Sequence, residues 1–414
     1  MKTKTLLLFF FILVNCTMFN ETLKGNLISY KEVSISDFNT AFPVINIEVN
    51  QNEYDEMFTN YKKEIEIEGF LNLYRNNQQV IFNELIEVEI KGTESATFAL
   101  KSLGIKFDDT FDNSRGDLLN PKTTLPNHSL EKIKAFRLRN SGNDFKQTLL
   151  KDISYTKLVI NSGLDIDLTY YEPAIVFVNN VFLGVMNLRS EGNTNGVSRL
   201  NNVRKNEITL AKVNYPGEIE KKDGDFDRID ILLKAINEQN LSYLQDNIDI
   251  ENFIDYMIFQ SYIANVDWPY NNVRIYAVNE GRFRFLLYDL DWANTRKKEN
   301  HPLDFIRNPS KYSTNDAIEN LITEMFNILY LDENFKTQFN NRYINIINNE
   351  LLSSEEFNNI IHDNLGEIEE YMPLHVEKYG DINTMIEWYR NIEYLKENFK
   401  TAINASCGIS TFPT

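Results

Sequence analysis

Cysteine is nearly absent from this 414-residue chain, which holds only Cys16 and Cys407. Two cysteines cannot build a disulfide framework or a cysteine zinc site. The four histidines show no metal-ligand spacing: His128, His301, His362 and His375. The fold must therefore depend on a packed core, for which 21 Tyr and 28 Phe supply the material.

Positive charge is also in short supply, because 42 Lys and Arg face 60 Asp and Glu, for a net charge of −18. This acidity argues against nucleic acid as a partner and against adhesion to anionic lipid. It also means that a phosphate ligand would need local cations or a metal ion. The chain contains no GxSxG, Walker A or HExxH motif.

Long apolar runs are missing except at residues 6–14, which follow Lys2 and Lys4. A basic start and a short apolar stretch predict a signal peptide over 1–15, too short for a stable membrane span. Cys16 comes next, as in a bacterial lipobox, although Asn15 replaces the usual small residue. We therefore expect a lipid on Cys16, a linker over 16–41 and an extracytoplasmic, cell-surface or periplasm-facing lipoprotein. Ordinary secretion is the alternative.

From residue 42 onward the pattern predicts an α+β protein with a β-rich N-terminal part. Alternating or β-branched segments at 43–50, 62–74, 79–92 and 102–107 predict strands of an antiparallel sheet. A helix is predicted to begin at Asn143 or Asp144 and to end at Gly163. A hairpin should then turn at Asn179-Asn180, since Asn tolerates positive φ.

The C-terminal part is predicted to be mostly helical. Residues 192–230 are polar with several glycines and predict a loop insertion that could act as a lid. Helices are expected over 226–247, over a buried apolar segment at 251–264, and after residue 301. A second hairpin separates two of these, with its turn at 279–281.

Four polar residues around this second hairpin form the candidate site. Asp267 and Asn272 follow the buried helix, and Asp289 and Asp291 follow the second strand. In protein kinases, a loop Asp orients the acceptor hydroxyl, an Asn five residues later binds metal, and a metal-binding Asp follows a hairpin. Carboxylate and amide oxygens suit Mg²⁺ or Mn²⁺. Without such a context, an Asp-x-Asp is an ordinary surface pattern and Asp267 could simply cap a turn.

Several segments resemble the CotH family of atypical protein kinases. The stretch VDWPYNNVRIYAVNEGRFRFLLYDLDWA resembles the family's Asp-Trp loop and its strand ending in Asp-Leu-Asp. FRLRNSGNDFKQTLLKDISYTKL, YYEPAIVFVNNVFLGVMNLRSE and IEYLKENFKTAI resemble three further family segments. KGTESATFALKSLGIKF is similar to a family loop and strand, with matches at Gly92, Ser95, Phe98, Lys101, Ser102, Ile105, Lys106 and Phe107. The resemblance covers roughly residues 42–405.

The resemblance implies a two-lobed kinase-like fold, with an N-lobe over about 42–190, a C-lobe over about 231–405 and a tail at 406–414. It implies transfer of phosphate from ATP to serine or threonine of a partner protein, with Mg²⁺ or Mn²⁺. Asp267 would be catalytic, and Asn272, Asp289 and Asp291 would hold the metal. Lys101 would contact the nucleotide phosphates, and Glu191 could pair with Lys101.

The loop before Lys101 departs from the family pattern. The departing residues are Lys91, Thr93, Glu94, Ala96 and Leu100. They leave the metal-binding acids intact but weaken the expected grip on ATP. Three hypotheses stay open: an active kinase, an inactive surface adhesin or scaffold, and a lipoprotein that binds structural Ca²⁺.

Overall fold

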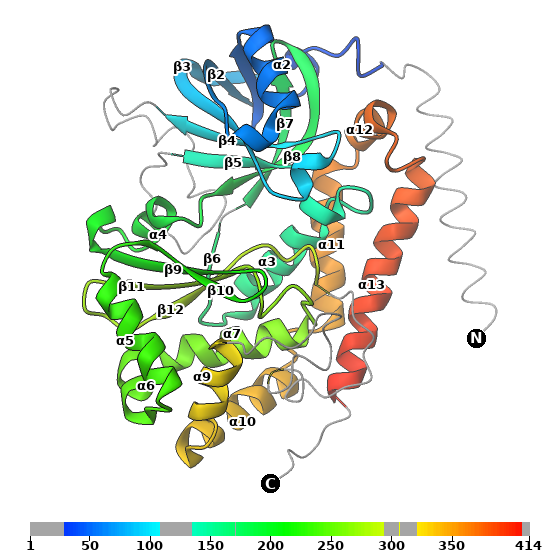
Figure 1. Cartoon of the computed structure of the whole chain (residues 1–414). Helices are drawn as coiled ribbons and strands as arrows, with labels where there is room; N and C mark the ends of the chain where they lie inside the picture. The colour runs from blue at the N-terminus through cyan, green and yellow to red at the C-terminus, as the bar shows by residue number, and fades with distance from the viewer. Residues whose placement is uncertain (1–28, 108–134, 170, 294–305, 307–320, 408–414) are drawn as a thin grey trace, which may run out of the picture.

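The computed structural model describes residues 29–107, 135–169, 171–293, 306 and 321–407. A strand-rich N-terminal end passes into a mostly helical C-terminal end, so the predicted α+β class is confirmed (Figure 1). The signal peptide and Cys16 lie outside the described residues. Within the described part of the chain, no helix has the length and apolar character needed to cross a membrane.

Seven strands close into a barrel, in the order β1, β2, β3, β4, β5, β8 and β7. Their bounds are β1 (Val44–Val49), β2 (Glu66–Arg75), β3 (Gln78–Lys91), β4 (Ser102–Phe107), β5 (Ala135–Arg139), β7 (Tyr171–Val178) and β8 (Val181–Ser190). Most neighbours are antiparallel, as predicted, but β1 pairs in parallel with β7, with Ile45 opposite Val176. This pair converts the predicted sheet into a barrel. Every residue of β7 is buried, as expected for a strand covered on both faces.

The barrel strands form where apolar residues alternate along the chain. In β2, Ile67, Leu71 and Leu73 are buried. The residues that alternate with them at the start of the strand, at positions 66, 68 and 70, are exposed. The hairpin of β7 and β8 turns at Asn179 and Asn180 with φ of 50° and 63°, which confirms the predicted turn. Helix α2 (Gln51–Thr59), with its N-cap Asn50, was not predicted.

A second sheet has the strand order β10, β9, β11, β12 and β6. The bounds are β6 (Asp167–Leu168), β9 (Ile208–Asn214), β10 (Glu218–Asp223), β11 (Val273–Val278) and β12 (Arg284–Leu287). The prediction of a loop over 192–230 is therefore wrong, because this region holds helix α4 (Thr194–Leu200), β9 and β10. Ile208, Leu210 and Val213 are buried. These apolar residues of β9 form only a short pattern, and the charged, alternately exposed residues of the neighbouring β10 made the whole region look like a polar loop.

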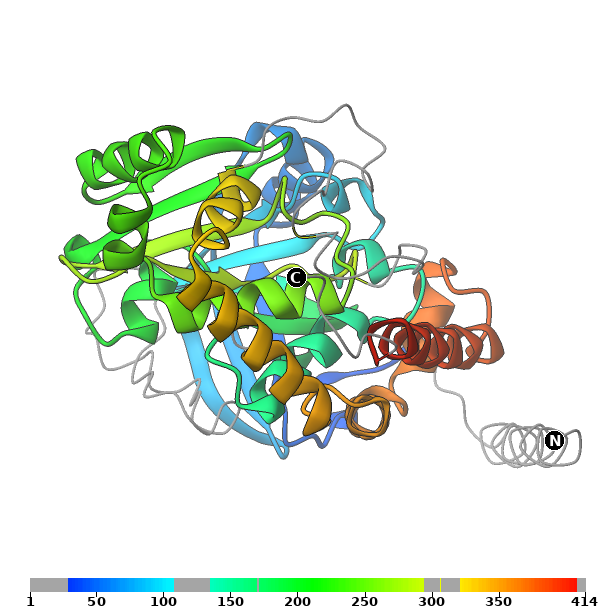
Figure 2. The same ribbon diagram turned by 90° about the horizontal axis from the view of Figure 1, so that it is seen from below.

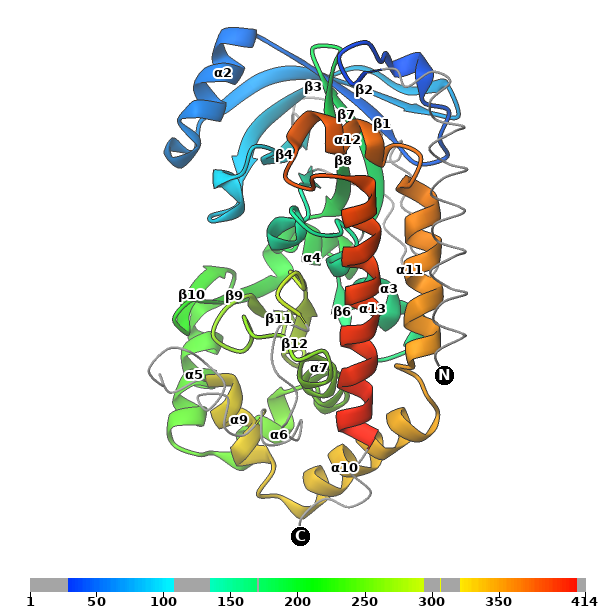
Figure 3. The same ribbon diagram turned by 90° about the vertical axis from the view of Figure 1, so that its right-hand side faces the viewer.

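The helices lie beside this sheet and at the end of the molecule away from the barrel, except that α12 packs against β8 of the barrel (Figure 1). They are α3 (Lys151–Ser162), α5 (Phe226–Asn237), α6 (Leu241–Asn247), α7 (Ile250–Tyr262), α9 (Leu321–Leu329), α10 (Glu333–Asn348), α11 (Ser354–Ile368), α12 (Met372–Tyr379) and α13 (Met385–Cys407). Figure 2 shows α10 across α7, and Figure 3 shows α11 and α13 side by side. The buried helix after residue 250 is confirmed as α7, in which residues 252–262 are all buried.

Helix α3 begins at Lys151, so its predicted start at Asn143 or Asp144 is wrong. Residues Gly142–Asp144 form a separate 3₁₀ turn, and Leu149 has a φ of 62° that interrupts any continuous helix. The predicted end is confirmed, because Gly163 has a φ of 67° at the C-cap. The irregular stretch before α3 carries part of the site described below.

The folded body begins before residue 42. Phe38 is buried, with its ring 5.6 Å from that of Phe177 and 6.1 Å from that of Phe182. The hydroxyl of Ser29 donates to Glu377 at 2.7 Å. The described end of the predicted 16–41 linker is therefore part of the fold. The few apolar residues of this polar segment follow no sustained periodicity, so the sequence pattern did not reveal that it belongs to the fold. At the other end, α13 continues to Cys407, past the predicted domain end at 405.

Candidate active site

The hairpin of β11 and β12 brings the two halves of the predicted site to one end. β11 begins directly after Asn272, and β12 ends two residues before Asp289. The two strands are antiparallel, with Arg274 opposite Leu286. The loop that carries Asp267 and the turn that carries Asp289 therefore flank the same end of the hairpin.

Asp267 is held by two amides of its own loop. Its Oδ2 accepts hydrogen bonds from Nδ2 of Asn271 at 3.0 Å and from Nδ2 of Asn272 at 2.5 Å. Asn272 has a φ of 54°, a left-handed conformation that Asn adopts more readily than most residues. Burial, and next the charge of Asp289, raise the pKa of Asp267 to about 6. The two acids thus lie close enough to interact electrostatically.

Asp289 and Asp291 share one guanidinium group. Nη2 of Arg139 bonds to the Asp289 carboxylate and lies 3.1 Å from Oδ2 of Asp291. Burial would raise the pKa of Asp289, but Arg139 holds it below its usual range. Burial and the charge of Asp289 raise the pKa of Asp291 well above the ordinary Asp value. One carboxylate is therefore ionised and the other favours its proton, and a nearby cation would favour ionisation of both.

Arg139 was not predicted as a site residue. It ends β5 and also approaches Asp152 of α3, at 3.7 Å, while Arg189 pairs with Asp152 at 2.8 Å. Oδ1 of Asp152 accepts from the backbone N–H of Leu290 at 3.1 Å, between the two acids. Arg139 lies in a segment that carried the family resemblance, but the residue pattern alone gave it no role.

The stretch before α3 also holds Asp291 in place. The backbone N–H of Asn143 donates to Oδ2 of Asp291 at 2.8 Å. Nζ of Lys151 donates to the backbone carbonyl oxygen of Asp291 at 3.1 Å. Gly142 has a φ of 57°, and a Cβ there would lie 1.9 Å from Oδ2 of Asp291. Only glycine lets the backbone approach this carboxylate so closely.

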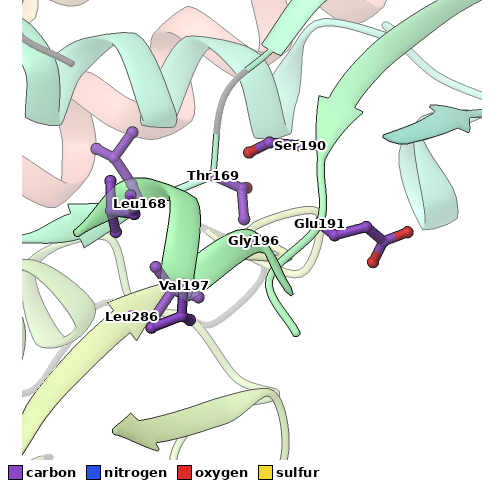
Figure 4. Close-up of a pocket in the computed structure, with 8 residues that line it drawn as sticks. Leu168, Thr169, Ser190, Glu191, Gly196, Val197 and Leu286 are labelled. Atoms are coloured by element: carbon purple, nitrogen blue, oxygen red, sulfur yellow. The ribbon is translucent and has the colours of Figure 1, made fainter. Parts of the chain in front are cut away.

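Lys101 and Glu191 do not pair, so this prediction is wrong. Nζ of Lys101 donates to the carbonyl oxygens of Ala96 and Phe98, and it lies 4.7 Å from the ring centre of Phe58. Glu191 pairs with Nε of Arg137 at 3.0 Å. Figure 4 shows its carboxylate directed away from the small apolar cavity at the end of β8. Lys101 bonds to backbone carbonyls and Glu191 pairs with Arg137, and neither partner could be predicted from the spacing of residues in the sequence.

The loop that precedes Lys101 nevertheless reaches the site. Nδ2 of Asn140, next to Arg139, donates to the carbonyl oxygen of Leu100 at 2.6 Å and thereby fixes the loop. The charge of exposed Glu94 is one of the smaller influences that raise the pKa of Asp267. Glu94, one of the residues that depart from the family pattern, therefore adds negative charge to the surroundings of Asp267.

The donors at this site fit a hard divalent cation. Asp289 and Asp291 supply carboxylate oxygens, and the nitrogen of Asn272 is engaged with Asp267, which leaves its oxygen as the donor. The Asp289 side chain is 26% exposed and therefore within reach of a ligand. No group of three or more His, Cys, Asp or Glu side chains in the described ranges is arranged to hold a metal. The proposed set is instead two carboxylates and an amide.

An Asp–Asn loop, a hairpin and a following pair of acids come in the same order as the metal-binding and catalytic residues of protein kinases. The chain belongs to the CotH family: a family model described as CotH kinase protein matches residues 88–401, most of its length. A search of curated proteins found no match.

Proposed function

We propose that this protein is an extracytoplasmic CotH-type kinase that transfers the γ-phosphate of ATP to serine or threonine of a partner protein. In this reading the barrel is the N-lobe, and the second sheet with its helices is the C-lobe. The supporting observation is that Asp267 and Asp289, from separate loops, flank one end of the β11–β12 hairpin, and that the charge of Asp289 helps to raise the pKa of Asp267.

Each acid has a distinct role in this proposal. Asp267, with a pKa of about 6, orients the acceptor hydroxyl and can take its proton late in the transfer. Asn272, Asp289 and Asp291 would hold Mg²⁺ or Mn²⁺, which when bound offsets charge on the β- and γ-phosphates. Arg139 neutralises the same acids, so metal binding requires it to share or release Asp289.

Lys101 has a less direct role than the family resemblance implies. Because its Nζ bonds to two carbonyls of the 92–101 loop, we assign it to holding the loop shape. Contact with the phosphates would require these bonds to break. Glu191, paired with Arg137, fixes the end of β8.

A catalytically weak or inactive CotH-like lipoprotein, acting as an adhesin or scaffold, is the second candidate. Two observations favour it: Lys101 is engaged within its own loop, and the negative charge of Glu94 influences Asp267. In both readings we propose that a lipid on Cys16 attaches the protein to the outer side of a membrane.

The test is phosphate transfer from labelled ATP by the mature chain, residues 16–414, with Mg²⁺ or Mn²⁺. Asp289→Asn should lower transfer by at least roughly 100-fold, because it removes a metal-binding charge. Asp246→Asn, at an exposed acid of α6, is the control and should change nothing. Undiminished transfer by Asp289→Asn refutes the assigned role. Wild-type protein that binds ATP and metal without transfer favours the inactive lipoprotein.

A further inference from the structure

A pocket lined by four cationic side chains lies on the second sheet. Its volume is about 210 Å³, and Lys205, Lys212, Lys222 and Arg274 line it with Asp223 as the acid among its lining residues. The pocket is built on β9, β10 and β11, with Asn193–Asn195 of the chain segment that leaves the barrel on its other side. Such a concentration of cations is unexpected in a chain with a net charge of −18.

Two of these cations face each other without compensation. Lys212 of β9 is directly opposite Arg274 of β11, and like charges in this position destabilise a sheet. Lys222 pairs with Glu220 and Lys205 lies 3.7 Å from Asp223, whereas neither Lys212 nor Arg274 forms an ion pair with any acid in the described ranges. Burial, followed by the charges of Arg274 and Lys222, lowers the pKa of Lys212. A bound anion would relieve this repulsion.

The pocket is connected to the acids through one aromatic residue. The guanidinium of Arg274 lies 4.1 Å from the ring centre of Tyr288, and Tyr288 directly precedes Asp289. The charges of Arg274, Asp289 and Asp267 all influence the Tyr288 hydroxyl. Arg274 at the pocket wall and Asp289 at the candidate active site therefore both act on Tyr288.

Gly192 makes this arrangement possible. A Cβ at this residue would lie 1.9 Å from Nη1 of Arg274. Glycine thus lets the segment after β8 pass directly over the guanidinium and leaves Arg274 at the wall of the pocket. Neither Asn193 nor Asn195 adds charge, and both can donate hydrogen bonds to an oxyanion.

We propose that the pocket formed by Lys205, Lys212, Lys222 and Arg274 is a phosphate-binding site distinct from the metal-binding acids. Arg recognises phosphate oxygens with a planar, bidentate fork, and the lysines add point charges. The phosphate belongs to the nucleotide donor or to a phosphorylated residue of the acceptor protein. This inference rests on the proposed kinase function for its role, but not for the binding itself.

The test is titration of the mature chain with pyrophosphate in EDTA and low salt, so that no metal takes part. Wild-type protein should bind, and binding should weaken as salt is added, because the attraction is between charges. Lys212→Gln and Arg274→Gln should each weaken binding at least tenfold. Lys234→Gln, at an exposed lysine of α5, is the matched control and should bind as wild type does.

Absence of pyrophosphate binding by the wild type overturns the proposal. So does unchanged binding by Lys212→Gln, even if Arg274→Gln fails to fold. Asp289→Asn should retain pyrophosphate binding in EDTA, so this site can be correct even where the kinase proposal fails.

Competition identifies the source of the phosphate. Displacement of pyrophosphate by metal-free ATP assigns the pocket to the donor. Displacement by a phosphoserine peptide, but not by its serine counterpart, assigns it to the acceptor. If neither competes, the pocket binds phosphate but serves neither the donor nor the acceptor, and its proposed role in the reaction is wrong.

Discussion

The turn that carries Asp289 and Asp291 and the loop 92–101 bound the same site but differ in how they are held. The turn is tied to the rest of the protein by Arg139, by the backbone N–H of Asn143 and by Asp152. In loop 92–101, Lys101 bonds to carbonyls of the loop itself, and the neutral amide of Asn140 ties the loop to the rest of the protein. The sequence departs from the CotH pattern in this loop and keeps the pattern in the acid turn. Under the proposed function, metal binding and the affinity for a nucleotide can therefore vary independently.

Loss of Arg139 should have the largest effect on the turn. Arg139→Met leaves Asp289 and Asp291 close together without the guanidinium that pairs with both, so the free energy of unfolding at pH 7 should fall by about 3–5 kcal/mol. Urea unfolding measures this. Arg204→Met, at an exposed arginine, is the control and should cost little. A loss below about 1 kcal/mol would mean that Arg139 does not organise the turn.

Gly142→Ala should come next, because it combines a positive φ with a clash against Asp291. We expect a loss of about 2–3 kcal/mol in the free energy of unfolding. Gly163→Ala is a matched control with a φ of 67° and no atom within 4 Å of its added Cβ, so it should lose only about 1 kcal/mol. Equal losses in the two variants would show that contact with Asp291 contributes nothing.

Asp267→Asn tests the charge repulsion within the site. Because the folded protein raises the pKa of Asp267 to about 6, stability gained from its protonated form is lost as the pH rises through that value. The Asn variant should therefore be more stable than wild type by about 1–2 kcal/mol at pH 7.5. The difference should disappear below pH 4. Thermal unfolding across this range measures it, and a pH-independent difference would contradict the shifted pKa.

Lys101→Met should change the affinity for ATP very little. If Lys101 acts on its own loop, the affinity for ATP with Mg²⁺ should change less than about threefold, while loss of two hydrogen bonds should cost about 1–2 kcal/mol of stability. Titration and urea unfolding separate the two effects. A loss of ATP affinity above tenfold would instead mean that Lys101 contacts the phosphates. The loop 92–101 would then bind ligand directly, and the difference from the turn that carries Asp289 and Asp291 would disappear.

Much of the local structure was predictable from residue patterns. Alternation of apolar residues identified the strands β1 to β4, Asn179-Asn180 identified a hairpin, and apolar residues on every face identified α7 as buried. The order of Asp267, Asn272, Asp289 and Asp291 around a hairpin identified the candidate site. These features depend on neighbours in sequence, and such neighbours are visible without a structure.

The features that were missed depend on contacts between distant residues. The parallel pairing of β1 with β7 joins segments more than 120 residues apart, and the sequence of neither strand indicates which strand it pairs with. Arg139 meets Asp289 across 150 positions. Lys101 lost its expected partner because carbonyls three and five residues away were nearer. In each case tertiary packing, rather than local preference, decided the outcome.

The closure of the barrel has a practical consequence for preparing this protein in pieces. The family match begins at Val88, near the end of β3, so a fragment trimmed to the matched span would lack β1, β2 and most of β3. The truncated β3 and the unpaired β7 would then both present open backbone edges, which invite pairing between molecules. Such a fragment should aggregate. A version that starts ahead of Ser29 retains β1 and β2, which pair with the edges of β7 and β3.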